Sequence, residues 1–216
     1  MSDIFREVDE DVRAQEYLRL WKTYGKYVIA GMVAIVVGTA GSVAWRNYQS
    51  TKLKAEGDKY AAAMDQFNDG DYAASAKAFE KIAGQASGGY KVVASLQEAE
   101  ADLKAGKKDD AVKLYNEIAA SSSYDKVYRD LASLSVAMQT INTADPEKLL
   151  SRLDAINTEE NPWRHSAQEL LAALALRTGD KQTAENLFKA LADDSTASSG
   201  IRSRARTMLA AMGSKS

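Results

Sequence analysis

Apolar residues follow two patterns along this chain: one continuous run near the N-terminus, and short repeated groups beyond it. Residues 27–45 read YVIAGMVAIVVGTAGSVAW and carry no formal charge. As a helix rising about 1.5 Å per residue, this run matches a hydrocarbon core of roughly 30 Å. In the groups beyond it, small and large apolar residues alternate at spacings of three to five, which predicts amphipathic helices. We therefore expect an all-α chain.

The flanks of the apolar run favour a membrane-spanning helix. Amphipathic rings prefer the headgroup layers, and basic residues bracket a span. The flanking residues of these two kinds are Trp21, Lys22, Tyr24, Lys26, Tyr27, Trp45, Arg46 and Tyr48. Two alternatives are a buried core helix and a signal peptide cleaved after Ser42-Val43-Ala44. Charge at both ends disfavours a core helix, and the acids before residue 27 disfavour a signal peptide.

Orientation rests on the bases nearest the span. Lys22 and Lys26 on the N-terminal side outweigh Arg46 on the other, although a count over longer flanks is a tie. We expect a cytoplasmic tail over 1–26, a transmembrane helix over 27–45 and an external domain over 46–216.

Small residues form a stripe within the predicted span. They lie three, four and three positions apart, on one helical face, where another membrane helix could approach closely: Gly31, Ala34, Gly38 and Gly41. Alternatively, the stripe reflects only the general abundance of glycine and alanine in membrane helices.

A repeated unit occupies the rest of the chain. Three turn signals, at Gly70, Gly106 and Gly179, are each followed at +5, +9 and +12 by small or apolar residues. A weaker copy follows Ala144, with Asp145-Pro146 as N-cap and first helical position. The residues at the three offsets are Ser75, Phe79 and Ile82; Ala111, Tyr115 and Ile118; Leu149, Leu153 and Ile156; Ala184, Phe188 and Leu191.

Each turn is also preceded by a recurring pair. A small residue lies seven positions before it and a large apolar one three before, which predicts antiparallel helical hairpins that must stack. The small residues are Ala63, Ala99, Ala137 and Ala172, and the large ones Phe67, Leu103, Ile141 and Leu176. Linkers are expected at Gly84 to Gly89, Ser121 to Ser123 and Ser195 to Gly200. A last helix, with Ile201, Ala205, Met208, Leu209 and Met212 on one face, should cap the stack.

Composition narrows the chemistry. A net charge of -2 provides no basic field for nucleic acid, and the chain has no cysteine for disulfides or thiolate chemistry. The single histidine, His165, is expected just inside a helix opened by Asn161-Pro162, partly exposed. Asp109-Asp110 is expected in the first turn of a helix and Asp193-Asp194 at a solvated helix end. We predict no catalytic, cofactor or metal site, and no enzyme.

The offsets resemble the tetratricopeptide repeat, although the usual tryptophan, tyrosine and terminal proline are missing and Leu149 replaces an alanine. The resemblance implies an α-solenoid of about four hairpins whose first helices line the inner surface of a curve. In that register the protein-binding positions are Tyr60, Met64, Leu96, Glu100, Leu134 and Met138. Purely structural packing of these residues is the alternative.

With the tail included, the whole chain is similar to the YfgM-like family of ancillary SecYEG translocon subunits. The similarity rests on the acidic start Asp9 to Val12, the segment Leu20-Trp21-Lys22-Thr23-Tyr24-Gly25, one span and weak repeats. It implies a single-pass inner-membrane protein with its repeat domain in the periplasm. Its partners would be membrane lipid, Sec translocon subunits, a membrane-anchored periplasmic chaperone and newly exported proteins. A scaffold for cell-envelope, division or outer-membrane assembly remains the alternative.

Overall fold

The computed structural model describes the backbone of residues 2–86 and 89–213, and side chains from residue 18 onward within those ranges. Throughout these ranges the regular elements are α-helices, which confirms the predicted all-α class. The chain divides into two compact units, Met1–Ala55 and Glu56–Ser216. The side chains of the acidic start, Asp9 to Val12, lie outside the described residues.

Helix α1 (Ser2–Asn68) contains the predicted span. Among the described residues, one helix, over Leu18–Asn68, is long and apolar enough to cross a membrane by length and composition, with a mean hydropathy of 2.0 in its most apolar window. No part of that window is buried within the structure, and Ile35, for example, is 71% exposed. The apolar run therefore has the properties of a segment that a lipid environment would cover.

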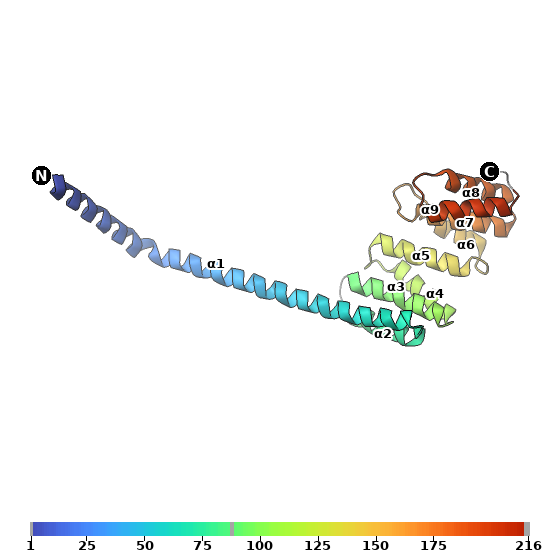
Figure 1. Ribbon diagram of the computed structural model, residues 1–216, viewed down its shortest axis with the longest axis horizontal. Helices are drawn as coiled ribbons and strands as arrows, with labels where there is room; N and C mark the ends of the chain where they lie inside the picture. Colours follow the sequence, from blue (N-terminus) through green and yellow to red (C-terminus); the bar gives the residue numbers. More distant parts are fainter. Residues whose placement is uncertain (1, 87–88, 214–216) are drawn as a thin grey trace. The chain divides into compact units, whose positions relative to one another are not determined.

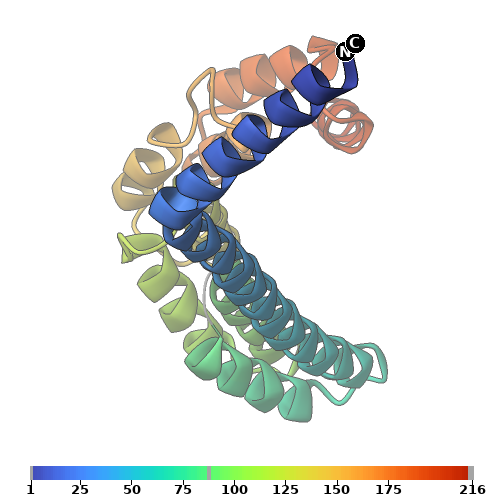
Figure 2. The same ribbon diagram turned by 90° about the vertical axis from the view of Figure 1, so that its left-hand side faces the viewer.

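The second unit contains the end of α1 and a series of shorter helices (Figure 1). They are α2 (Tyr72–Gln85), α3 (Gly89–Lys104), α4 (Lys108–Ala120), α5 (Lys126–Thr140), α6 (Pro146–Asp154), α7 (Arg164–Thr178), α8 (Lys181–Asp193) and α9 (Ser199–Ala211). In Figure 2, α2 to α9, coloured green to red, follow one another around an arc. The predicted hairpin turns at residues 70, 106, 144 and 179 all fall between consecutive helices.

Glycine makes three of the four turns possible. Gly70, Gly106 and Gly179 have φ values of 85°, 82° and 86°, a left-handed conformation that costs glycine no steric strain. The residue after each glycine donates its backbone N–H to a carbonyl five residues earlier, as in Asp180 N to Ala175 O at 2.9 Å. These bonds satisfy carbonyls that the ending helix leaves free.

The third turn is built differently. Asp145 accepts a hydrogen bond from the backbone N–H of Glu147 at 2.9 Å, and Pro146 is the first residue of α6. Proline fits this position because its missing N–H would have no partner inside the helix. The predicted N-cap and N-terminal proline are confirmed, and no residue of this turn needs a positive φ.

The recurring positions form a large part of the core. All twelve residues at +5, +9 and +12 are buried, as are the four alanines seven positions before the turns. At the first repeat the small polar residue is satisfied locally, since Ser75 Oγ donates to the carbonyl of Ala63 at 2.9 Å. The buried apolar residues form clusters that follow one another along the chain. The last cluster includes Ala205 and Leu209 of α9, which confirms the capping helix.

The connections differ in detail from expectation. Helix α2 continues to Gln85, so the first linker begins later than Gly84, and its residues 87–88 lie outside the described part. Helix α7 begins at Arg164, so Asn161-Pro162 does not open it, contrary to prediction. Instead, Asn161 is buried and donates from Nδ2 to Asp130 Oδ2 at 2.7 Å, which fastens the preceding loop to α5. The predicted cap was wrong because this long-range bond fixes Asn161 outside the helix.

Candidate functional site

A groove of about 450 Å³ lies between α5, α7 and α9. These helices are the first helices of two successive hairpins and the capping helix. The groove is mostly apolar, and the apolar residues that line it most prominently are Leu134, Met138, Trp163, Leu170, Phe188 and Met208. We refer to it as the α5–α7–α9 groove.

One ion pair fixes the charged side of this groove. Arg204 on α9 donates from Nε and Nη2 to the two carboxylate oxygens of Glu169 on α7, at 2.6 Å each. The Arg204 side chain is 60% exposed and that of Glu169 23%, so the pair remains in contact with water. Such a bidentate pair holds its partners in one relative orientation. The groove thus presents an apolar floor beside a positioned guanidinium.

Two of the six predicted protein-binding residues line the groove. Leu134 is buried in its floor, whereas Met138 is 55% exposed and available for contact. Methionine is flexible and polarisable, and it adapts to differently shaped apolar partners.

The other four predicted residues lie on α1 and α3, away from this groove. Tyr60 packs edge-on against Phe79, with ring centroids 5.2 Å apart. Met64 and Leu96 are half-buried against the neighbouring core clusters. Glu100 is within 3.8 Å of Lys104 on the same helix. These are contacts within the chain, and a protein-binding role for the four residues stays a prediction.

The fourth hairpin supplies groove residues that the sequence prediction omitted. Glu169 and Ala173 line the groove and lie ten and six positions before Gly179, as Leu134 and Met138 do before Ala144. Extending the same offsets by one hairpin would have found them. No such rule leads to Arg204 or Met208, because the capping helix has no following turn from which to count.

Comparison with known proteins places this architecture in a family. The family model of the tetratricopeptide repeat-like domain matches residues 19–213. The chain belongs to this family. A crystal structure of nearly identical tetratricopeptide-like repeats, from a protein of Podosopora anserina described as a kinesin light chain, has a TM-score of 0.56. The alignment has 18% identity and covers 71% of this chain and 82% of that one, so it supports the fold alone. No curated protein matches the chain.

Tetratricopeptide-like repeats are typically non-catalytic scaffolds for protein–protein interaction. In the part of the chain that the structure describes, no cluster of three or more His, Asp or Glu side chains could hold a metal ion. The first-turn position of Asp109 and Asp110 in α4 is confirmed.

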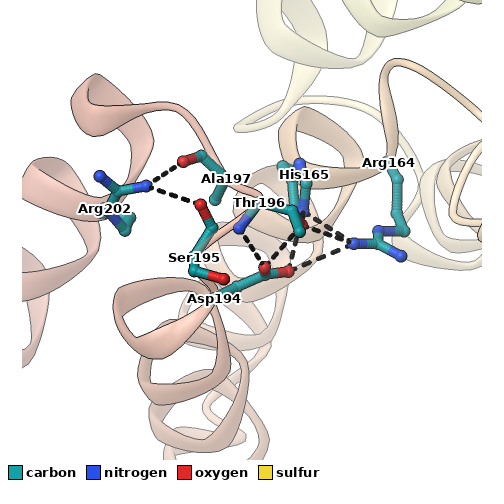
Figure 3. A network of polar contacts seen from close by, with 7 residues as sticks. All are labelled: Arg164, His165, Asp194, Ser195, Thr196, Ala197 and Arg202. Atoms are coloured by element: carbon teal, nitrogen blue, oxygen red, sulfur yellow. Dashed lines mark hydrogen bonds and ion pairs between the residues drawn. The ribbon is translucent and has the colours of Figure 1, made fainter.

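The tetratricopeptide-like unit contains one polar network that sequence reasoning missed (Figure 3). Asp194, after α8, was expected at a solvated helix end. It does lie at the end of α8, and it also accepts hydrogen bonds from Arg164 Nη2 at 3.2 Å and the His165 ring at 2.9 Å, both at the start of α7. The hydroxyl and backbone N–H of Thr196 donate to its other oxygen at 2.6 and 2.7 Å.

This network is structural. The two Thr196 bonds, followed by that of His165, hold the pKa of the Asp194 carboxyl well below its usual range. Arg202 on α9 donates to the carbonyls of Ser195 and Ala197, so the same loop is fastened at its far end (Figure 3). The contacts position the α8–α9 connection against α7. Asp193 and Asp194 lie at the end of α8 as predicted, but the network was missed because partners 29 and 30 residues away meet Asp194 only after the hairpins stack.

The small-residue stripe lies in the first unit. A side chain added at Gly31, Gly38 or Gly41 would meet no atom within 4 Å, and Ala34 is exposed. This face of α1 is accessible in the structure.

Proposed function

We propose that this chain is a membrane-anchored, non-enzymatic adaptor of the Sec translocon. In this proposal residues 27–45 span a bacterial inner membrane, residues 1–26 face the cytoplasm and residues 46–216 hold the repeats in the periplasm. The repeat unit would contact periplasmic chaperones or newly translocated proteins. The observation that carries the adaptor role is the apolar α5–α7–α9 groove, formed by the first helices of stacked tetratricopeptide-like hairpins.

The groove suits extended or partly folded protein segments. Its size is within the range of clefts that enclose a ligand group, and its lining is mostly apolar. Met138 provides an adaptable exposed contact, and Arg204 can offer its remaining N–H groups to a carbonyl or carboxylate. A partner would therefore need apolar side chains with acceptor groups beside them.

The translocon as neighbour is supported by the anchor and the tail. The segment Leu20 to Gly25, directly before the span, resembles that of translocon-associated subunits. The Trp21 ring lies over Gly25, since a Cβ there would be 3.1 Å from that ring. We expect the Gly31-Ala34-Gly38-Gly41 face to be where a membrane partner approaches.

Site-specific photocrosslinking in native membranes tests this proposal. A photoreactive residue replaces Met138 in the groove, Gly38 in the span or, as a control, the exposed Ala190 of α8. We expect adducts with Sec channel subunits from Gly38, and with a periplasmic chaperone or exported proteins from Met138.

The adducts also identify the alternative. Cell-wall, division or outer-membrane assembly proteins captured from Met138, with no Sec subunit from Gly38, would favour the envelope scaffold. A Met138 pattern identical to that of Ala190 would reject the groove as a binding site. Capture of cytoplasmic proteins from Met138 would reject the proposed orientation.

A further inference from the structure

The repeat provides an internal comparison between grooves of one kind. Each lies where the second helices of two successive hairpins are neighbours, above the first helix of the later hairpin. Two such grooves are present, α2–α4 above α3 and α6–α8 above α7, and the equivalent place between them is α4–α6 above α5. Equivalent offsets from the turns take equivalent places in stacked repeats, so these grooves can be compared position by position.

The α2–α4 groove is charged. Glu98 and Asp102 lie eight and four positions before the turn at Gly106, and both line the groove. Lys107, one position after the turn, lies with Nζ 3.3 Å from Asp102 Oδ1. The lining thus contains both signs of charge.

The equivalent place between α4 and α6 is bridged by a side chain of the chain itself. Arg152, eight positions after the third turn, donates from Nη2 to Asn116 Oδ1 on α4 at 2.9 Å. It also reaches Ser133 Oγ on α5 at 3.5 Å. The guanidinium therefore ties these three helices together.

The α6–α8 groove is open and apolar, with a volume of about 430 Å³. Leu171 occupies the position of Glu98, and Leu187 occupies the position of Arg152. Leu150 on its wall is 47% exposed. Asp154 occupies the position of Asn116. Because Leu187 stands where the preceding repeat has Arg152, no arginine of α8 reaches Asp154.

Acidic residues surround this apolar floor without a base. Glu147, Asp154 and Asp180 belong to the lining, which includes no lysine, arginine or histidine. None of the three forms an ion pair among the described residues. The groove therefore leaves Leu150 uncovered on its apolar wall and lacks a cation that would face Asp154.

We propose that the α6–α8 groove docks a basic amphipathic segment of a partner protein. A leucine-like side chain of the partner packs on the exposed Leu150 and the half-buried Leu187, and an arginine or lysine reaches Asp154, as Arg152 reaches Asn116 in the preceding repeat. The site lies on a different face of α7 from the α5–α7–α9 groove. It is therefore a second docking surface, independent of the proposed adaptor function.

Fluorescence anisotropy on the full-length chain in phosphatidylcholine nanodiscs tests this inference. The probe is a labelled synthetic peptide with leucine at helical spacing and arginine between the leucines. A counterpart has glutamate in place of arginine. We expect saturable binding of the arginine peptide to the chain, none to empty nanodiscs and none of the glutamate peptide.

Groove variants locate the binding site. Leu150→Ser and Asp154→Asn change exposed side chains, and each should weaken binding about tenfold, the first by loss of an apolar contact and the second by loss of a charge-assisted one. Leu187→Arg should abolish binding, because it supplies the missing cation from within the chain. Met138→Ser, in the other groove, should leave the affinity unchanged.

Three results would overturn the inference. They are equal binding of both peptides, binding that Leu150→Ser and Asp154→Asn leave intact, and binding lost only in Met138→Ser. Concentration-dependent self-association of the chain that Asp154→Asn abolishes would instead assign the groove to a second copy, which also rejects a basic partner. The circular dichroism of each variant must match that of the parent chain.

Discussion

At the residue scale, the turn glycines are required for their backbone conformation and not because space around them is short. A Cβ at Gly179 would meet no atom within 4 Å, yet its φ of 86° disfavours any other residue. We expect Gly179→Ala to lower the free energy of unfolding by about 1 kcal/mol. Gly84→Ala is the matched control, because Gly84 is helical and also has free space around it. This substitution should stabilise the folded chain by about 0.5 kcal/mol. Thermal unfolding followed by circular dichroism would show the opposite shifts.

Glu98 provides a pH-dependent prediction at the same scale. Burial, then the nearby Glu80, Asp102 and Glu117, raise the pKa of Glu98 to about 7. Glu98 lines the α2–α4 groove, which is also lined by Lys77, Lys107 and Lys113. The folded state therefore binds the Glu98 proton more tightly than the unfolded chain, whose glutamates titrate at about 4.3. This group lowers stability as the pH rises from about 4.3 to about 7.

Glu98→Gln should remove this loss. We expect the variant to be more stable than the parent at pH 8 by about 1 kcal/mol, a value reduced for screening by water, with a smaller difference at pH 5. Glu159→Gln, at an exposed position, is the control. Denaturant unfolding at both pH values measures the effect. A parent chain that gains stability relative to Glu98→Gln between pH 5 and pH 8 would contradict the assignment.

At the element scale, each hairpin depends on a small residue where its helices touch. Ala172 in α7 is fully buried, with Ala184 and Phe188 of α8 in the same cluster. Ala172→Leu should therefore cost about 1–3 kcal/mol through overpacking. Ala190→Leu, on the exposed side of α8, should change stability by less than about 0.5 kcal/mol. Equal effects of the two substitutions in chemical denaturation would show that the hairpin tolerates a larger residue at its contact.

At the scale of the whole molecule, the two units predict where the chain can be cut. Deletion of residues 1–55 should leave a detergent-free, cooperatively folding repeat unit, because the second unit begins at Glu56. Deletion of residues 1–68 should lower its stability by at least about 3 kcal/mol, because Phe79 loses Tyr60 and Ser75 loses the Ala63 carbonyl. Size-exclusion chromatography and urea unfolding compare the two truncations. Similar stability of both would mean that the end of α1 contributes nothing to the first hairpin.

Local rules explain how far sequence reasoning reached. Turn glycines, the Asp145-Pro146 helix start and the buried offsets depend on interactions within a few residues and on helical periodicity. Leu134 and Met138 of the α5–α7–α9 groove follow from the same register, as do Glu169 and Ala173. Arg204 did not follow from the register, because it pairs with Glu169 across 35 residues and joins the capping helix α9 to the repeat helix α7.

The sequence by itself determined the helical class, the turn within each hairpin and the recurring part of the core, because periodicity and backbone conformation are local. Only the tertiary structure decided which side chains meet across stacked hairpins. Arg152 of α6 reaches Asn116 of α4, 36 residues away, and closes the space between these helices. The next place along the stack, the α6–α8 groove, stays open. The physical reason is that these contacts depend on which long side chain reaches across from a neighbouring hairpin, and that follows from packing in three dimensions.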